Sequence, residues 1–415
     1  MTTEYLDDIG VKAKKAASAL ARLTSNEKNM ALTLCAESLE KSIDDILSAN
    51  EEDMKNAADI TDAYRDRLRL TKNRIADMAK GLRVIAGLPD PVNEVIAMKS
   101  LPNGLIVGQK RVPMGVIAII YEARPNVTAD AFGLCFKAGS SVILRGGKEA
   151  IKSNAAIAQV FNNVLQSLGL DANIVQLITD TSRETARELM KLNRYIDLLI
   201  PRGGAGLIRA VTENSTIPVI ETGVGNCHIF VDESADLQKA APIIINAKTQ
   251  RPGVCNAAEK LLIHQSIARD FVPAICEQLQ SKGVQIRGDE RAARFTSGII
   301  PANDDDWDTE YSDLIIAVKI VDNLDDAIEH INAHSSRHSE AILTESYTNS
   351  QRFLNEIDSA AVYVNASTRF TDGGEFGFGA EIGISTQKLH ARGPMGLKEL
   401  TSTKYIIYGN GQYRQ

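Results

Sequence analysis

The stretch GVIAIIYEARPNVTADAFGLCFKAGSSVILRGGKEA, residues 115–150, decides the fold class of this chain. An apolar run rich in β-branched residues fills 115–121, a helical pattern covers 128–139, and a second apolar run covers 141–146. Gly139 stands where a helix C-cap is expected, because glycine readily takes the left-handed conformation that ends a helix. A strand, a helix and a strand in this order predict two parallel strands joined by a crossover helix.

The same alternation continues to residue 221 and predicts a doubly wound parallel sheet. Further strands are expected at 172–179, 196–201 and 217–222, with helices at 149–169, 181–192 and 204–214 between them. Thr181 and Glu184 have the spacing of a capping box and predict where the 181–192 helix begins. The first strand is not followed by G-x-G-x-x-G, so the usual dinucleotide fingerprint is missing.

A second alternation predicts another α/β domain, with a boundary near residues 222–228. Strands are expected at 228–233, 258–264, 314–321, 338–344 and 359–365, and helices at 236–248, 265–280, 324–334 and 347–357. The acidic segment 301–313, which holds the single Trp, is expected to be a surface loop.

Two further regions flank these domains. Residues 1–87 are predicted to be helical, because apolar residues such as Leu32, Cys35 and Leu39 recur at helical spacing. Two extended runs around Asn103-Gly104 predict a hairpin with a type I′ turn. The tail, residues 401–415, contains an apolar strand whose exposed backbone edge needs a partner.

Charge and composition exclude several classes of protein. The 46 Lys and Arg residues and 53 Asp and Glu residues give a net charge of −7, which disfavours nucleic acid as the main partner. No apolar run approaches the ~18 residues of a membrane span, and the acidic N-terminus does not resemble a signal peptide. The five cysteines have no C-x-x-C spacing, which argues against disulfides and structural zinc and favours the cytoplasm.

Cys255 is the strongest candidate for a nucleophile. It lies in TQRPGVCNAAEK, between a helix and a strand, and Arg251 nearby would favour the thiolate. Cys227, in ETGVGNCHIF, is the competing candidate, and either cysteine could instead be structural. His330 and His334 have a spacing that could bind a metal, but no H-E-x-x-H surrounds them, so a solvated helix face is favoured and no metal is expected.

Other polar residues follow predicted strands, where ligands bind in open α/β sheets. Glu221 follows the 217–222 strand and could bind a ligand or cap a turn. In PRGGAG, the backbone N–H groups around Gly203 and Gly204 could face a phosphate. Arg124 and the amide of Asn126 follow the 115–121 strand, and an amide there could stabilise an oxyanion.

In this order, the motifs resemble those of the aldehyde dehydrogenase superfamily over nearly the whole chain. The motifs that carry the resemblance are GVIAIIYEARPN, SVILRGGKEA, IPRGGAG, VIETGVGN, RPGVCNAAE, TEY, AAVYVN, DGGEFGFGAEIGIST and LHARGPMGL. The resemblance implies an aldehyde dehydrogenase-like α/β fold, with two doubly wound domains and an oligomerisation element formed by a β-hairpin and a C-terminal strand. It implies a cofactor-binding domain at 1–225, with 366–395 returning to it, a catalytic domain at 226–365, an oligomerisation hairpin at 95–112 and an oligomerisation strand at 400–415.

The resemblance also implies roles for individual residues. Cys255 is expected to be the nucleophile, with the Asn126 side chain and the Cys255 N–H as oxyanion donors. Glu221 lies where related enzymes keep a water-activating base, so its role is catalytic or structural. The residues expected to bind the cofactor are Arg145, Gly146, Lys148, Gly203, Gly204, Glu221 and Glu310, and the substrate or phosphate is expected to bind Arg124, Arg251 and Arg392. The cations Arg145 and Lys148 would accept a ribose 2′-phosphate, which favours NADPH.

A close resemblance within the superfamily implies the NADPH-dependent reduction of L-glutamyl 5-phosphate to L-glutamate 5-semialdehyde through a Cys thioester, with release of phosphate. This is the second step of proline biosynthesis from glutamate. The alternatives are another oxidoreductase of the superfamily, which hydrolyses its thioester or passes it to coenzyme A, and a cysteine hydrolase or cofactor-free binding protein. The resemblance further implies a homo-oligomer in which the tail strand pairs across subunits. A transient contact with a separate glutamate 5-kinase is also expected, because an acyl phosphate is labile in water.

Overall fold

The computed structural model describes residues 2–57 and 62–414, which form two compact units. Unit 1 contains Met1–Thr222, Gly377–Gly383 and Met395–Gln415, and unit 2 contains Gly223–Phe376 and Ile384–Pro394. Within 366–395, the stretch expected to return to the first domain, only Gly377–Gly383 and Met395 therefore belong to unit 1.

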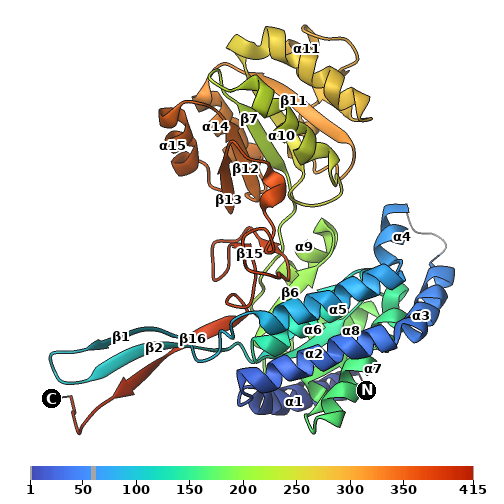
Figure 1. The fold of residues 1–415 in the computed structure, drawn as a ribbon, viewed down its shortest axis with the longest axis vertical. Coiled ribbons are helices and arrows are strands. Elements are labelled where there is room, and N and C mark those ends of the chain that lie inside the picture. Colours follow the sequence, from blue (N-terminus) through green and yellow to red (C-terminus); the bar gives the residue numbers. More distant parts are fainter. Residues whose placement is uncertain (1, 58–61, 415) are drawn as a thin grey trace. The chain divides into compact units, whose positions relative to one another are not determined.

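The N-terminal part of unit 1 is helical. Its helices are α1 (Thr2–Leu20), α2 (Ser25–Lys41), α3 (Ile43–Asn56), α4 (Asp62–Leu68) and α5 (Lys72–Gly87). A capping box of Thr24 and Glu27 begins α2, which runs beside α5 (Figure 1). The side chains of Leu32, Cys35 and Leu39 are fully buried, as their helical spacing predicts.

The sheet of unit 1 is parallel and has the strand order β5-β4-β3-β6. Its strands are β3 (Val116–Tyr121), β4 (Ser141–Arg145), β5 (Val175–Leu177) and β6 (Leu198–Arg202). The connecting helices are α6 (Asn126–Lys137), α7 (Ile151–Ser167), α8 (Arg183–Leu189) and α9 (Ala205–Asn214). Two 3-10 turns accompany them: η1 (Lys148–Ala150) precedes α7, and η2 (Ala172–Ile174) precedes β5. Every residue of β3 is buried, so this strand lies at the centre of the core.

Two local predictions in unit 1 are wrong. The segment 217–222 forms only an isolated bridge between Leu199 and Val219, because Pro218 in its middle has no N–H to donate to a ladder. Helix α8 is capped by Ser182, whose hydroxyl accepts the N–H of Thr185 at 3.2 Å, and not by Thr181.

A three-stranded antiparallel sheet has the order β1-β2-β16, with strands β1 (Val95–Ser100), β2 (Ile106–Pro113) and β16 (Thr401–Tyr408). The predicted hairpin is present, but its turn is not type I′: the N–H of Gly104 donates to the carbonyl of Leu101 at 2.9 Å, and the N–H of Leu101 closes a longer loop onto the carbonyl of Leu105 at 2.8 Å. Type I′ needs positive φ at both Asn103 and Gly104, but of these two residues only Gly104 has it, at +85°. The tail strand pairs along one edge with β2 of its own chain.

Unit 2 is built on a parallel sheet of seven strands in the order β10-β9-β11-β8-β7-β12-β13. The strands are β7 (Cys227–Val231), β8 (Ala258–His264), β9 (Gln285–Gly288), β10 (Ile300–Pro301), β11 (Ile315–Val321), β12 (Ser339–Leu343) and β13 (Ala361–Val364). The helices are α10 (Leu237–Thr249), α11 (Gln265–Ser281), α12 (Glu290–Ala293), α13 (Asp305–Asp308), α14 (Leu324–His334) and α15 (Tyr347–Glu356), and η3 (Thr368–Phe370) follows β13. Strands β7, β8 and β12 are entirely buried.

The acidic segment 301–313 is not simply a surface loop. It forms the short helix α13, which buries the side chains of Asp306 and Trp307. Asp306 is compensated by Arg287, whose guanidinium lies 2.6 Å from its carboxylate. No helix within residues 2–57 and 62–414 is long and apolar enough to cross a membrane.

Candidate active site

Cys255 lies on the loop between α10 and β8, at the amino-terminal edge of the unit 2 sheet, and its side chain is partly exposed. The loop is held from one side by the segment that contains η3. The hydroxyl of Thr368 donates to the carbonyl of Asn256 at 2.7 Å, and the Asn256 amide donates to the carbonyl of Thr371 at 2.9 Å. Cys255 is therefore a reachable thiol on a fixed backbone.

The segment that precedes β7 closes on the other side of this loop. A Cβ atom on Gly225 would lie 1.6 Å from the carbonyl oxygen of Cys255, so only glycine fits at this position. The N–H of Gly225 donates to a carboxylate oxygen of Glu310 at 2.9 Å. Two predicted site residues, Cys255 and Glu310, are thus brought together in unit 2 through one glycine.

Cys227, the competing nucleophile, lies directly beneath Cys255. It is fully buried as the first residue of β7, and its thiol donates to the carbonyl of Cys255 at 3.1 Å. Burial raises the pKa of this thiol well above its ordinary value. Cys227 therefore supports the loop as a neutral hydrogen-bond donor, and Cys255 remains the candidate nucleophile.

Buried charges hold the loop that carries Glu310. The ammonium of Lys260 donates to the carbonyl of Thr309 at 2.7 Å, and a carboxylate oxygen of Glu259 accepts the N–H of Ser312 at 3.2 Å. Lys248 forms a fully buried ion pair with Glu259 at 3.0 Å. Burial raises the pKa of Glu259 to about 7 and lowers that of Lys260 to about 8. These positioning residues escaped prediction, although two adjacent charges in the apolar strand 258–264 were a signal for them.

The predicted cations of unit 2 occupy different surroundings. Arg251 is exposed at the end of α10, four positions before Cys255 in the sequence. Arg392 lies 2.8 Å from the carboxylate of Asp358, which Lys388 also contacts at 2.7 Å, and these two cations lower the pKa of Asp358 to about 2. Arg369 was not predicted as a site residue. It donates a hydrogen bond to Asn256, next to Cys255, whereas Arg392 donates to Asp358, outside the Cys255 loop.

In unit 1, the residues that follow β3 carry the predicted oxyanion donor. Asn126 is exposed as the first residue of α6, and its amide donates to the carboxylate of Asp130 at 3.0 Å. Burial raises the pKa of Asp130 to about 6, against the opposing effects of Asn126 and of the charge of Arg202. Arg124 is partly buried in the turn just before this helix. Asp130 is a further residue at this site that the sequence reasoning missed.

Glu221 is partly buried at the end of unit 1. Its neighbour Thr222 is anchored by a hydrogen bond of 3.0 Å to the carbonyl of Pro201, so the backbone that carries Glu221 is fixed against the end of β6. Glu221 and Cys255 belong to different units.

The predicted cofactor residues of unit 1 gather at the carboxyl ends of neighbouring strands. Arg145 is the last residue of β4, Gly146 and Lys148 follow this strand, and Gly203 and Gly204 follow β6, with β3 between the two strands. The guanidinium of Arg145 donates to the carbonyls of Thr181 and Ser182. Its Nε atom is buried and has no partner among the described residues. Lys148 is exposed.

This edge fits a dinucleotide that carries phosphate groups. The Gly204 N–H, at the start of α9, already binds a carboxylate oxygen of Glu122 at 2.9 Å, which shows that this helix N-terminus accepts an anion. The unsatisfied Nε atom of Arg145 and the exposed ammonium of Lys148 provide donors at the carboxyl end of β4, which β3 separates from β6. Arg145 and Lys148 would hold a ribose phosphate, and the Gly203–Gly204 turn would face the phosphate bridge.

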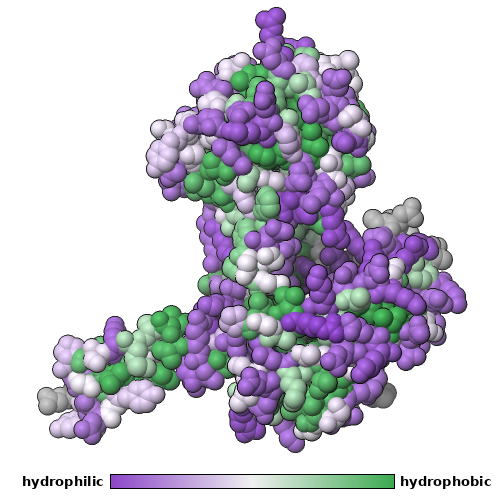
Figure 2. All heavy atoms as spheres, in the orientation of Figure 1, coloured by the Kyte–Doolittle hydropathy of each residue, from purple (hydrophilic) through white to green (hydrophobic). Residues whose placement is uncertain are grey.

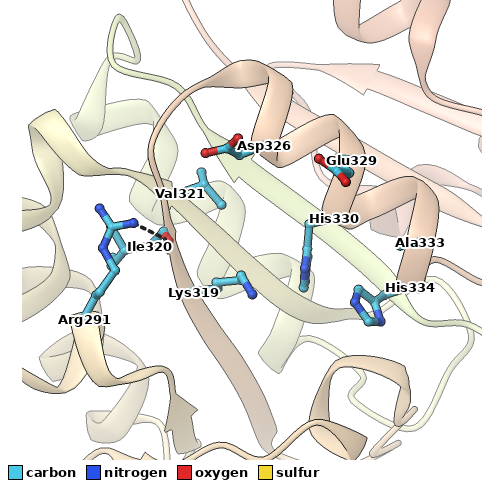
Figure 3. Close-up of a pocket in the computed structure, with 9 residues that line it drawn as sticks. All are labelled: Arg291, Lys319, Ile320, Val321, Asp326, Glu329, His330, Ala333 and His334. Carbon is cyan, nitrogen blue, oxygen red and sulfur yellow. Dashed lines mark hydrogen bonds between the residues drawn. The ribbon is translucent and has the colours of Figure 1, made fainter.

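A surface pocket of about 360 Å³ lies elsewhere in unit 2, between α14 and β11 (Figure 3). Cys255 does not line it, whereas His330 and His334 do. His330 does not lie on a solvated helix face: it is 8% exposed and packs edge-on against Trp307, because α14 turns this side toward the sheet. Burial lowers the pKa of His330 to about 2, so the ring is neutral. His334 instead lies 2.8 Å from the carboxylate of Asp308.

Comparisons with known proteins show the family to which the chain belongs. Residues 1–299 match the sequence model of the aldehyde dehydrogenase family. The chain is 59% identical over 414 residues to a gamma-glutamyl phosphate reductase of Lachnospira eligens, covering 99% of this chain and 100% of that protein. It is 60% identical over 410 residues to one of Caldicellulosiruptor bescii, covering 97% and 98% of the two chains. The crystal structure of gamma-glutamyl phosphate reductase from Thermotoga maritima superposes with a TM-score of 0.96 at 51% identity, covering 99% of this chain and 100% of that one.

The chain therefore belongs to the aldehyde dehydrogenase family and, within it, to the gamma-glutamyl phosphate reductases. The fold expected from the sequence, aldehyde dehydrogenase-like α/β with an additional antiparallel element, is confirmed.

Proposed function

We propose that this chain reduces L-glutamyl 5-phosphate to L-glutamate 5-semialdehyde with release of phosphate, the second step of proline biosynthesis from glutamate. The names of its relatives support this substrate. The observation within the structure that carries the proposal is the partly exposed Cys255 thiol, set on a loop that is clamped by Thr368 and closely approached by Gly225. A nucleophile held in this way is what thioester chemistry requires.

The residues of the chain then divide the work. The Cys255 thiolate attacks the acyl carbon, and the backbone N–H of Cys255 with the amide of Asn126 stabilises the negative charge that develops on the oxygen. One such donor contributes about 3–4 kcal/mol in comparable sites. The carbon–sulfur bond forms, the bond to the phosphate oxygen breaks, and phosphate leaves. Asp130 keeps the Asn126 amide oriented through its hydrogen bond of 3.0 Å.

The cofactor proposed is NADPH, held at the carboxyl edge of the unit 1 sheet. A nicotinamide cofactor, when bound, supplies the hydride that reduces the thioester. The carbon–sulfur bond then breaks, which releases the semialdehyde and returns the Cys255 thiolate. Arg145 and Lys148 would bind the 2′-phosphate, Gly146 would let the backbone approach the ribose, and Gly203 and Gly204 would face the pyrophosphate. Glu310, anchored by the Gly225 N–H beside Cys255, would bind the nicotinamide ribose.

Three predicted residues keep more general proposed roles. Arg124 and Arg392 are proposed to bind the substrate's carboxylate or phosphate, and Arg392 would first have to leave Asp358. Glu221 is proposed to be structural or to contact the cofactor, because a reaction that releases phosphate needs no water-activating base.

We propose that the three-stranded sheet mediates homo-oligomerisation. Strands β1 and β16 are its edges, and all three strands expose aliphatic or tyrosine side chains. Figure 2 shows hydrophobic residues as green spheres along this sheet. The exposed residues are Val95, Ile96, Met98, Ile106, Tyr405, Ile407 and Tyr408. A second copy that adds its own edge strand would satisfy the unpaired backbone groups and cover this surface. A monomer in light scattering at micromolar concentration would contradict the proposal.

We also propose that the protein acts in the cytoplasm, where a glutamate 5-kinase delivers the labile acyl phosphate through a transient contact. A coupled assay checks the contact. If free solvent competes fully for the acyl phosphate, the two enzymes do not transfer it directly.

The test of the function uses the purified protein, L-glutamate 5-semialdehyde and NADP+, with NADPH followed by its absorbance. Turnover should require inorganic phosphate, because phosphate must release the thioester. Turnover without phosphate would instead indicate a hydrolytic enzyme of the family and would restore Glu221 as a base. Turnover that requires coenzyme A would indicate an acylating one.

A further inference from the structure

Arg369 extends from η3 to the segment that carries Cys255. Its Nε atom donates to the side-chain oxygen of Gln250 at 3.1 Å, and a terminal nitrogen of its guanidinium donates to the side-chain oxygen of Asn256. Gln250 and Asn256 lie before and after the nucleophile in the sequence, so the guanidinium spans the base of the Cys255 loop. All of these residues belong to unit 2.

The backbone of Arg369 is held as firmly as its head group. The hydroxyl of Ser367 accepts the Arg369 N–H at 3.3 Å, and the Asn256 amide donates back to the Arg369 carbonyl at 3.3 Å. An arginine fixed at both ends loses little conformational freedom when it binds a ligand, which is the property of a preorganised binding group.

The positive charge of Arg369 is not cancelled by its hydrogen-bond partners, because both are neutral amide oxygens. Burial lowers the pKa of this guanidinium, and the charge of Arg251 lowers it further, whereas Cys255 and Asp372 act in the opposite direction. The Asp372 carboxylate accepts the backbone N–H groups of Gly374 and Glu375 at 2.8 and 3.4 Å. The partly buried Arg369 and the exposed Arg251 thus interact electrostatically near Cys255, and two cations in this position favour the binding of a doubly charged anion.

We propose that Arg369, together with Arg251, binds the phosphate group of the acyl phosphate and stabilises it as it leaves. This inference rests on the proposed function and assigns a role to a residue outside the set predicted from the sequence. As the sulfur–carbon bond forms and the carbon–oxygen bond breaks, its electron pair passes to the phosphate oxygen. The planar fork of a guanidinium matches two oxygens of that phosphate.

The position of Arg369 favours the phosphate over the substrate's α-carboxylate. The leaving oxygen is bonded to the carbon that Cys255 attacks, so the phosphate must lie beside the nucleophile loop. The α-carboxylate stands at the far end of the carbon chain. Arg369 hydrogen-bonds the side chain of Asn256, which directly follows Cys255.

The experiment separates phosphate binding from the earlier steps. Without phosphate, the semialdehyde and NADP+ should give a burst of one NADPH per site, because thioester formation needs only Cys255 and the cofactor. Added phosphate should then release the thioester and start turnover. In Arg369→Gln, we expect a full burst, and the semialdehyde concentration that gives half of the maximal burst rate should be unchanged. The KM for phosphate should rise about 10- to 100-fold, which is the range for losing a charged hydrogen bond.

Variants and outcomes keep the two proposals distinguishable. Arg369→Lys retains the charge and should restore part of the phosphate affinity, and Gln250→Ala removes one partner without the charge and should change the KM for phosphate only slightly. Arg352→Gln, on the exposed surface of α15, is the matched control.

A wild-type protein without a burst would overturn the proposed function itself. An unchanged KM for phosphate in Arg369→Gln, or a raised half-saturation for the semialdehyde alone, would overturn the role of Arg369. An equally reduced burst in Arg369→Gln and Gln250→Ala would show that Arg369 only maintains the loop.

Discussion

In unit 1 the predicted cofactor residues lie at the carboxyl ends of β4 and β6, whereas in unit 2 Cys255 and Glu310 precede β8 and β11 at the amino-terminal edge of the sheet. Unit 1 supplies glycines, an exposed Lys148 and backbone N–H groups at the edge of a sheet whose central strand is apolar. Unit 2 supplies one thiol and supports it with buried charges such as Lys248 and Glu259.

This difference suits the two proposed tasks: unit 1 binds the cofactor, and unit 2 carries the nucleophile that reacts with the substrate. The carboxyl ends of parallel strands are the common ligand site of open α/β sheets, and unit 1 follows that rule. Unit 2 does not follow it, because its nucleophile loop is fixed by segments that converge on the opposite edge, before β7 and after β13. We call the edge of unit 1 that carries Arg145, Lys148 and Gly204 the recognition edge, and the edge of unit 2 that carries Cys255 and Glu310 the reaction edge. Single substitutions should have small effects at the recognition edge and large effects at the reaction edge.

The largest effect should separate the two cysteines of the reaction edge. Cys255→Ala should reduce kcat by about 10⁴-fold or more, because no other group can form the thioester. Cys227→Ala should retain kcat within about tenfold, since it loses only a buried hydrogen bond beneath the loop. Assays in the direction of NADPH formation measure both, and iodoacetamide labelling followed by mass spectrometry should modify Cys255 first. Preferential labelling of Cys227 would reverse the assignment.

Breaking the buried ion pair of unit 2 should have the next largest effect. Lys248→Met leaves Glu259 buried without its partner, so the free energy of unfolding should fall by about 3–5 kcal/mol. The urea midpoint of the transition that reports on unit 2 measures this. Lys239→Met, which removes an exposed cation 3.1 Å from Asp236, is the control and should leave that midpoint unchanged. Equal midpoints for both variants would mean that the buried charges do not support this edge.

The stability of unit 2 should also depend on pH through Glu340, whose carboxyl group accepts the backbone N–H of His228 at 2.6 Å. Burial raises the pKa of Glu340 to about 8 from an ordinary value of 4.5, so the folded state keeps a proton that the unfolded chain has lost. The resulting stability is complete below the unfolded value and is lost as the pH rises through 8. Between pH 6.5 and 8.5, the melting temperature of the wild type should therefore fall more steeply than that of Glu340→Gln. Parallel curves would contradict the assignment.

The smallest effect is expected at the recognition edge. Lys148→Ala should raise the KM for NADPH about fivefold, the scale of one exposed charged contact, and should leave the KM for NADH unchanged. Lys152→Ala, on an exposed position of α7 just beyond, is the matched control and should change neither constant. Equal increases for both cofactors would remove Lys148 from the proposed 2′-phosphate site.

Much of the fold could be predicted because its signals are local. The alternation of apolar runs and helical patterns located the strands β3, β4, β7, β8, β11, β12 and β13. The predictions failed where one residue changed the local geometry: Pro218 prevents a strand, Asn103 does not take the positive φ of a type I′ turn, and Ser182 caps a helix in place of Thr181. The short strands β9 and β10 were missed because runs of four and two residues carry too little periodicity.

Sequence alone determined the class of the fold, the order of the motifs and the choice of Cys255 as the leading nucleophile, because these depend on residue type and on neighbours along the chain. Only the tertiary structure decided that Cys227 is buried beneath Cys255, that Glu310 binds the Gly225 N–H, and that Arg369 reaches the nucleophile loop. Each of these contacts joins segments that are distant in sequence. Their geometry is set by how the strands and loops pack, which no local pattern of residues records.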